Sequence, residues 1–127
     1  MAQQACPLFV PLAEEGWIDG GVPQMVAWSY LGELRAAVVD TLVLGCTHYP
    51  LLKPVIASTM GAEVTLIDSA EAAAAETARV LQKQGLSAPA GEGREDHFFV
   101  TDPADRFRAV GERFLHGSIE RLEQVTL

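Results

Sequence analysis

Three side chains suited to acid–base chemistry stand together at Cys46, Thr47 and His48: a thiol, a hydroxyl and an imidazole. They follow Thr41–Leu44, a short aliphatic and β-branched run typical of a buried strand in a parallel sheet. Gly45 lets the backbone turn after that strand without a Cβ clash. Because ligands of open α/β sheets bind at the carboxyl ends of the strands, we expect these side chains to lie where chemistry is usually done.

The thiol of Cys46 is the candidate base, and its neighbours are candidates to assist it. A free thiol has a pKa of about 8.5, so it needs help to act as a thiolate near neutral pH. His48 lies two positions further on, and residues i and i+2 of an extended or turn segment can share a face. Thr47 can offer a hydroxyl and a backbone N–H to a carboxylate. Each residue also has a structural alternative. Cys46 could be a small buried thiol, His48 a core histidine and Thr47 a simple helix cap.

The remaining chemistry-bearing residues favour structural roles. Cys6 is interpreted as a small buried hydrophobe, and His97 and His116 as surface residues near the ends of elements. No cysteine or histidine cluster has zinc spacing, and no phosphate loop or dinucleotide fingerprint is present. We therefore predict neither a metal nor a cofactor.

The composition of the chain suits one cytoplasmic domain. It has 127 residues, of which 49% are hydrophobic, and a net charge of −8 that argues against nucleic acid as a partner. No apolar run approaches the roughly 20 residues of a membrane span, and the N-terminus does not read as a signal peptide. The two cysteines are then expected to be free thiols.

Strands and helices are predicted to alternate along the chain, which favours a parallel α/β sheet. Prolines at positions 7 and 11 predict a short extended piece rather than a ladder strand. Asp68 and Ser69 are good helix caps, and Gly61, Gly85 and Gly117 are expected to end helices. The predicted elements are an extended piece at 8–10, helices at 24–38, 54–60, 71–84 and 102–116, strands at 41–44, 64–67, 98–100 and 125–127, and a loop at 86–96.

One stretch also carries a family resemblance. The run Gly45–Leu52, Gly-Cys-Thr-His-Tyr-Pro-Leu-Leu, resembles the second cysteine motif of the glutamate racemases. The stretches Cys6–Gly16 and Leu66–Ser69 resemble the family's segments upstream and downstream of that motif. Related racemases that act on aspartate or hydantoins resemble the motif only as far as Thr47. The first half of the family, with its partner cysteine, has no counterpart, so the chain resembles a C-terminal half.

The resemblance implies a fold of two similar α/β lobes, in which the chain returns to the first lobe after building the second. The return would fall near Asp68. Residues 1–67 would then form part of the second lobe, and residues 68–127 would be a segment of the first. Both parallel-sheet lobes would be incomplete in this chain.

The resemblance also implies a chemistry. The family consists of cofactor-independent isomerases that convert L-glutamate to D-glutamate for peptidoglycan, cell-wall biogenesis and cell shape, using one thiol from each lobe. Cys46 would be one thiol, His48 would tune it and Glu14 would assist. Thr47 and Cys46 would also bind the substrate. Glu15 replaces Glu14 if the alignment shifts by one residue.

The implied partners are glutamate and an N-terminal half that carries the second catalytic cysteine, and a homodimer stays open. One thiol cannot perform a two-base reaction, so the isolated chain is expected to be inactive. Two alternatives remain: a related racemase with another substrate, and a non-catalytic remnant or binding module.

Overall fold

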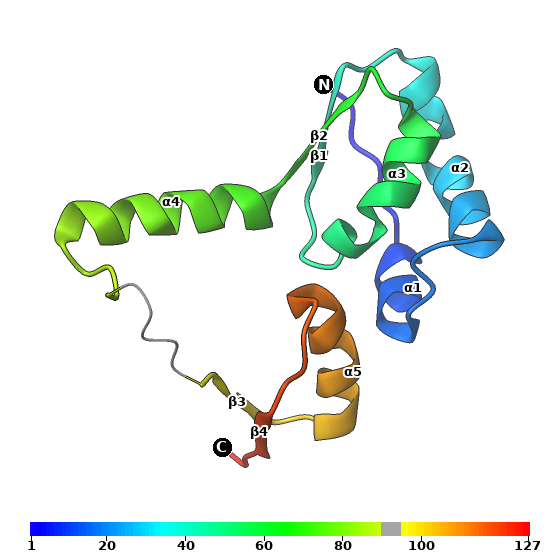
Figure 1. Ribbon diagram of the computed structural model, residues 1–127. Coiled ribbons are helices and arrows are strands. Elements are labelled where there is room, and N and C mark those ends of the chain that lie inside the picture. Colours follow the sequence, from blue (N-terminus) through cyan, green and yellow to red (C-terminus); the bar gives the residue numbers. More distant parts are fainter. Residues whose placement is uncertain (90–94) are drawn as a thin grey trace. The chain divides into compact units, whose positions relative to one another are not determined.

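The computed structural model describes residues 1–89 and 95–127, so residues 90–94 of the predicted loop lie outside the described part (Figure 1). Met1–Val80 form one compact unit and Leu81–Leu127 form another, called the N-terminal and C-terminal units below. No helix in the described ranges is long and apolar enough to cross a bilayer. The elements are α1 (Phe9–Glu15), α2 (Gly21–Ala36), β1 (Thr41–Leu44), the 3-10 helix η1 (Tyr49–Leu52), α3 (Lys53–Met60), β2 (Thr65–Asp68), α4 (Ser69–Gln84), β3 (His97–Val100), α5 (Ala104–Leu115) and β4 (Arg121–Gln124).

Two short parallel strands, the helices α1, α2 and α3, the 3-10 helix η1 and most of α4 build the N-terminal unit. β1 pairs with β2 in parallel, with Leu42 opposite Leu66 and Leu44 opposite Asp68. Alternate side chains of a strand face opposite sides of the sheet, and Leu44 is buried while Val43 is 67% exposed. The core on the buried side consists of Cys6, Phe9, Leu12, Ala13, Ala27, Leu31, Leu34, Leu44, Leu52, Val55, Ile56 and Met60. The predicted α/β class with parallel strands is therefore confirmed.

The predicted extended piece at 8–10 is wrong, because these residues enter helix α1. Pro11 is the third residue of that helix, where the backbone N–H has no intrahelical partner to lose. Phe9, Leu12 and Ala13 share one face and are buried, which stabilises the helix by packing. Gly16 ends it in a left-handed conformation with φ of 79°.

A capping hydrogen bond and two ion pairs of Lys53 stabilise the junction between β2 and α4. The Asp68 carboxylate accepts the backbone N–H of Glu71 at 2.9 Å, which confirms Asp68 as a cap of α4. Lys53 Nζ lies 2.7 Å from Asp68 and 2.6 Å from Glu71. The hydrogen bond from Lys53 is the main cause that lowers the pKa of Asp68, and the same bond raises the pKa of Lys53.

We expect the free energy of unfolding of Asp68→Asn to fall less than that of the parent chain as the pH is lowered. A carboxyl whose pKa is lower in the folded state stabilises it above the unfolded pKa of about 3.9, and this contribution is lost as the pH falls through the folded value. Urea midpoints between pH 7 and pH 2.5 should therefore fall less steeply in Asp68→Asn than in the parent. Glu76→Gln, which removes an exposed pair with Arg79, is the control and should change the slope much less. Equal slopes for Asp68→Asn and the parent would contradict the prediction.

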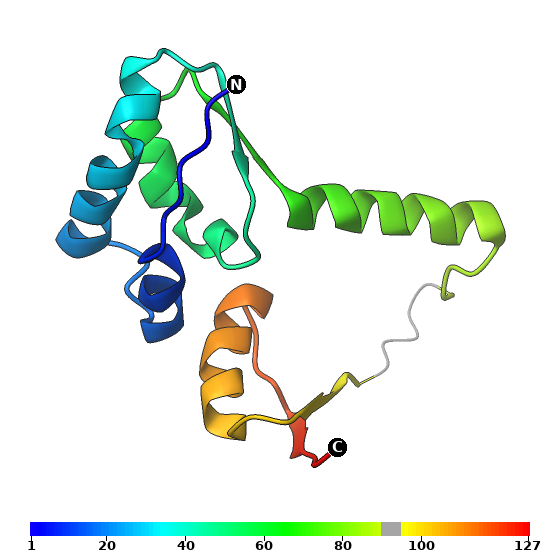
Figure 2. The same ribbon diagram turned by 180° about the vertical axis from the view of Figure 1, so that it is seen from behind.

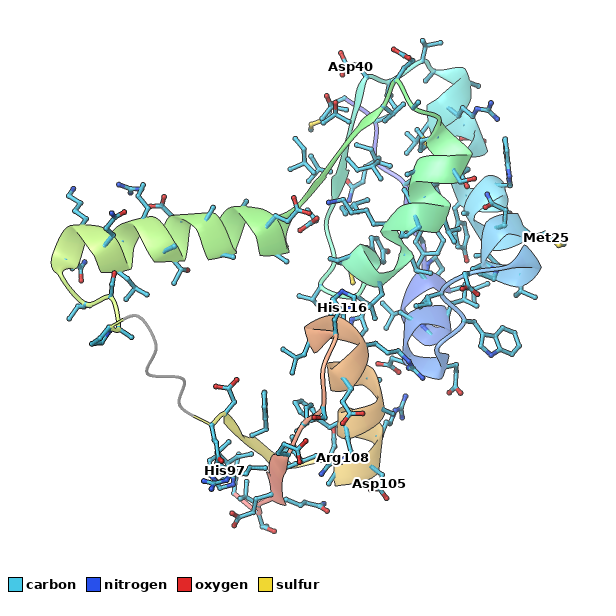
Figure 3. All side chains as sticks on the ribbon, in the orientation of Figure 1. Met25, Asp40, His97, Asp105, Arg108 and His116 are labelled. Carbon is cyan, nitrogen blue, oxygen red and sulfur yellow. The ribbon has the colours of Figure 1, made fainter. Side chains whose placement is uncertain are left out.

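Among its described residues, the C-terminal unit contains the end of α4 and one strand–helix–strand crossover. β3 and β4 pair in parallel, with Phe98 opposite Leu122, and α5 connects them. Val100 and Ile119 are buried, and Phe98 lies 6.1 Å from Phe107 between ring centroids. Arg108, which projects from α5 in Figure 3, donates a hydrogen bond to the carbonyl of Ile119.

Two predicted details of this unit are wrong. The last strand is Arg121–Gln124 rather than 125–127, because it pairs residue by residue with β3 although only Leu122 in it is apolar. The stop of α5 is His116, with φ of 50°, rather than Gly117.

Gly111 fits α5 against a neighbour that leaves no room for a side chain. A Cβ there would lie 2.8 Å from Cδ1 of Ile119, which is 1% exposed and has little space to move. We therefore expect Gly111→Ala to destabilise the C-terminal unit by about 1 kcal/mol, since overpacking of roughly 1–3 kcal/mol exceeds the helix-propensity gain of about 1 kcal/mol.

Gly32→Ala is the matched control, because a Cβ at that position in α2 meets no atom within 4 Å. This variant should be stabilised by up to about 1 kcal/mol. Thermal unfolding followed by circular dichroism measures both changes, and a higher melting temperature for Gly111→Ala would show that the contact relaxes freely.

Candidate functional site

The residues between β1 and α3 form one tight turn. The N–H of Tyr49 donates to the carbonyl of Cys46 at 3.3 Å, and the N–H of Leu51 donates to the carbonyl of His48 at 3.2 Å. The turn runs directly into η1, which tolerates Pro50 near its start. Cys46, Thr47 and His48 therefore lie together at the carboxyl end of β1, where the sequence places them.

His48 lies between a carboxylate and a hydroxyl. Its Nε2 is 3.5 Å from Oε1 of Glu14, and its Nδ1 is 3.3 Å from Oγ1 of Thr47. If the ring carries its single proton on Nε2, facing the carboxylate, Nδ1 can accept a hydrogen bond from the threonine hydroxyl. The His48 and Glu14 side chains are 27% and 29% exposed, so the arrangement is open to a small solute.

Glu14 rather than Glu15 is the acid beside the histidine. Glu14 lies in the last turn of α1 with its carboxylate toward His48, whereas Glu15 is exposed. Successive residues of a helix point about 100° apart, so two neighbouring acids cannot face the same partner. The structure thus brings together all four predicted site residues, Cys46, Thr47, His48 and Glu14, within one turn and the helix end beside it.

The two cysteines differ in environment. Both are free, as predicted, but Cys6 is buried whereas Cys46 is partly exposed. Burial raises the pKa of the Cys6 thiol, which disfavours the reactive thiolate. The interpretation of Cys6 as a small buried hydrophobe is therefore confirmed.

Tyr49 links the turn after β1 to the segment that begins α1, and its role was not evident from the sequence. Its hydroxyl donates to the carbonyl of Cys6 at 3.3 Å, and its ring packs edge-on against Phe9 with centroids 5.3 Å apart. Burial is the largest cause that raises the pKa of Tyr49, followed by the charges of Cys6 and Cys46. Tyr49 is thus a positioning residue that holds α1 against the turn. An aromatic residue directly after His48 was the signal available.

No group of three or more histidine, cysteine, aspartate or glutamate side chains in residues 1–89 and 95–127 could hold a metal ion. The chemistry that this arrangement can perform is proton transfer by a thiol, with an imidazole and a carboxylate beside it.

Known proteins resemble the chain in sequence and in structure. No family model matches it. A glutamate racemase from Geobacter metallireducens is 54% identical over 124 residues, which are 98% of this chain and 46% of that protein. The crystal structure of glutamate racemase from Thermus thermophilus with β-chloro-D-alanine matches at 45% identity with a TM-score of 0.83, covering 98% of this chain and 47% of that one. Glutamate racemase from Francisella tularensis in complex with D-glutamate has a TM-score of 0.83 at 36% identity.

These matches cover almost all of the chain and only part of each relative. The chain spans about half the length of the curated relatives that it matches. Sequence and structure together show that nearly the whole chain is similar to about half of a glutamate racemase.

Proposed function

We propose that this chain contributes one half of the active site of a glutamate racemase. The observation that supports the proposal best is the juxtaposition of Cys46, Thr47 and His48 with Glu14 at the carboxyl end of β1. The relatives support the substrate, because one of them was crystallised with D-glutamate. Glutamate is therefore the proposed ligand and racemisation the proposed reaction, without a metal or an organic cofactor.

The proposed reaction moves one proton off Cα and another onto its opposite face. The thiolate of Cys46 takes the Cα proton and becomes a thiol, while the Cα–H electron pair stays on the substrate as a carbanion. A second thiol then gives its proton to the opposite face of that carbanion and becomes a thiolate. Each conversion balances in atoms and charge, and before the next conversion in the same direction Cys46 loses its proton to solvent while the second thiolate gains one.

The neighbours of Cys46 have separate roles in this proposal. His48 tunes the thiol, and the carboxylate 3.5 Å from its Nε2 orients the imidazole. Thr47 binds the substrate carboxylate through its hydroxyl or its N–H. Since Thr47 also lies 3.3 Å from Nδ1 of the same ring, substrate binding and imidazole orientation are coupled.

The second thiol comes from outside this chain. Cys6 is buried in the core of the N-terminal unit, so the partner cysteine must come from the half that the relatives have in addition. Residues 1–67 are proposed to belong to the second lobe and residues 68–127 to the first. The product would serve peptidoglycan synthesis in the cytoplasm, and a homodimer of the complete protein remains part of the proposal.

Reconstitution tests the function. This chain is co-expressed with the N-terminal portion of the Geobacter metallireducens racemase that the alignment leaves out, and D-glutamate formed from L-glutamate is measured by chiral chromatography. We expect racemisation from the pair and none from either part. No product from a pair that co-purifies as a stable complex would overturn the proposal.

Three observations favour a second candidate, a non-catalytic remnant. The chain has one cysteine at the candidate site, its other cysteine is buried, and it covers 46% of the curated relatives from Geobacter metallireducens and Syntrophus aciditrophicus. A remnant would bind glutamate without exchanging its Cα proton, whereas a half-enzyme gains activity with its partner. The remaining alternative is a related racemase with another substrate. The same reconstituted pair tests it when L-aspartate is supplied in place of L-glutamate.

We expect substitutions of His48 and Glu14 to affect the two reaction directions unequally. Both residues stand on the Cys46 side, so Glu14→Gln and His48→Asn should slow proton abstraction by Cys46 more than abstraction by the opposite thiol. Removal of such an assisting group costs typically 100-fold or more. The overall equilibrium cannot change, so kcat and KM must shift together to preserve it.

The measurement is the rate of deuterium incorporation at Cα, followed separately from L-glutamate and from D-glutamate. Glu15→Gln is the matched control, since Glu15 is exposed and should leave both rates unchanged. Equal losses in both directions would argue that His48 and Glu14 hold the structure rather than serve one thiol.

A further inference from the structure

The turn that carries Cys46 is anchored at both of its ends by buried leucines. Leu44 is the last residue of β1, Leu52 is the last residue of η1, and both side chains lie in the core of the N-terminal unit. The residues between them are partly or fully exposed. Two backbone hydrogen bonds, from the N–H groups of Tyr49 and Leu51, cross this segment. A short exposed segment opens more easily than the core, so the fixing of its ends decides how firmly Cys46 is held.

One carboxylate joins the two ends of this segment. Asp68, the last residue of β2, lies opposite Leu44 in the strand register. Lys53 follows directly after Leu52, and its Nζ donates to Oδ2 of Asp68 at 2.7 Å. In both ribbon views β2 leads into α4, and the turn after β1 lies at the same end of the two strands (Figures 1 and 2). The Lys53–Asp68 pair therefore closes residues 45–52 into a loop that begins and ends beside Asp68.

The pair is shielded from water on its Asp68 side. The Asp68 side chain is 2% exposed, and its Oδ1 accepts the backbone N–H of Glu71 at 2.9 Å while Oδ2 accepts Lys53. A buried carboxylate is held in place by the partners that compensate its charge. Glu71, the second ion-pair partner of Lys53, is 78% exposed, and a pair in water contributes little. Asp68 is thus the partner that fixes the Lys53 side chain.

We propose that Lys53 is a positioning residue for the Cys46 thiol and acts through the buried carboxylate of Asp68. The pair holds the end of η1 against the end of β2, so it fixes the turn in which Cys46 and His48 lie. Lys53 acts here through the backbone and does not touch the substrate. A misplacement of a reacting group by about 1 Å can cost about 100-fold in rate. The inference rests on the proposed function, because it assigns a task within that racemisation.

Hydrogen exchange of the turn tests the pair without any catalysis. The chain alone, at low concentration, is compared with Lys53→Met by mass spectrometry at the resolution of single amides. We expect the amides of Tyr49 and Leu51 to exchange at least about tenfold faster in the variant. The amide of Trp17, which is hydrogen-bonded elsewhere in the N-terminal unit, is the internal reference and should not change. Unchanged exchange at Tyr49 and Leu51 would overturn the inference.

A double variant separates the loosened turn from a general loss of stability. Lys53→Met alone leaves a buried carboxylate without its cation, which destabilises the fold as well. Lys53→Met combined with Asp68→Asn removes both charges and keeps a side-chain oxygen that caps α4, so its circular dichroism should be that of the parent. Its turn amides should still exchange faster. Glu71→Gln, which removes only the exposed pair, is the matched control and should exchange as the parent does. Parental exchange in the folded double variant would overturn the inference.

Kinetics then show whether the pair serves the reaction. In the enzyme reconstituted with the N-terminal portion of the Geobacter metallireducens racemase, the double variant should lower kcat at least about tenfold, with KM for glutamate within a few-fold of the parent. The loss should occur in both directions, because Cys46 is the base in one and the acid in the other. Lys53→Arg keeps a cation that can reach Asp68 and should restore most of kcat. Parental kcat in the double variant, with only its melting temperature lowered, would make Lys53 purely structural and overturn the inference.

The outcomes separate the pair from the proposed chemistry. Faster exchange of the turn amides in the variants, with no racemase activity in the reconstituted parent, supports the pair as the support of the turn and counts against the proposed function. Racemase activity in the parent, with parental kcat and parental exchange in the double variant, supports the function and overturns the inference.

Discussion

Replacing Cys46 by serine is expected to slow glutamate racemisation by at least about 100-fold in the reconstituted enzyme, because a positioned acid–base group contributes typically 10²–10⁴-fold. A serine hydroxyl is a far weaker acid than a thiol, so it cannot supply an anionic base near neutral pH. Cys46 lies partly exposed in the turn at the carboxyl end of β1, and the substitution keeps its size nearly unchanged. The loss should appear in kcat rather than in the affinity for glutamate.

Cys6→Ala is the matched control for that experiment. Cys6 is 5% exposed, and its side chain packs in the core of the N-terminal unit. Alanine leaves a small void there, so we expect lower stability with racemisation within a few-fold of the parent. Rates of Cys46→Ser within a few-fold of the parent in both directions would remove Cys46 from the proposed mechanism.

The chain alone should be catalytically silent. Its candidate site has one thiol at one wall, and a single base cannot deliver a proton to the opposite face of Cα. Incubation of the purified chain with L-glutamate in D₂O should therefore give neither D-glutamate nor deuterium at Cα above the background without protein, as measured by NMR and mass spectrometry. Deuterium at Cα without inversion would show that one thiol and solvent suffice for exchange.

The chain alone is also expected to self-associate. Large apolar side chains lie exposed on both units, among them Val43 at 67%, Trp17 at 56%, Phe99 at 58% and Phe107 at 37%. Each such side chain contributes about 1.5–3 kcal/mol when fully buried, so a partner surface that covers them would be strongly favoured. A monodisperse monomer in light scattering at high concentration would show that these side chains are tolerated in water.

The sequence by itself determined the part of the site that is local. The run Thr41–Leu44 is aliphatic and ends at a glycine, so both β1 and the turn of Cys46 to His48 after it were predictable. Helix ends with strong signals were predictable for the same reason: Asp68 caps α4, and Gly85, with φ of 68°, ends it. In each case the residues that decide the conformation are neighbours in the chain.

The tertiary structure decided what depends on distant partners. Prolines before and within 8–15 argued for an extended piece, yet burial of Phe9 and Leu12 makes the segment a helix. The rotation of that helix about its axis then places the carboxylate of Glu14, and not that of Glu15, beside His48. The sequence alone does not distinguish these two adjacent acids. β4 likewise forms where β3 pairs with it. Local propensity sets which conformations a segment can adopt, and burial and pairing with residues far along the chain select one of them.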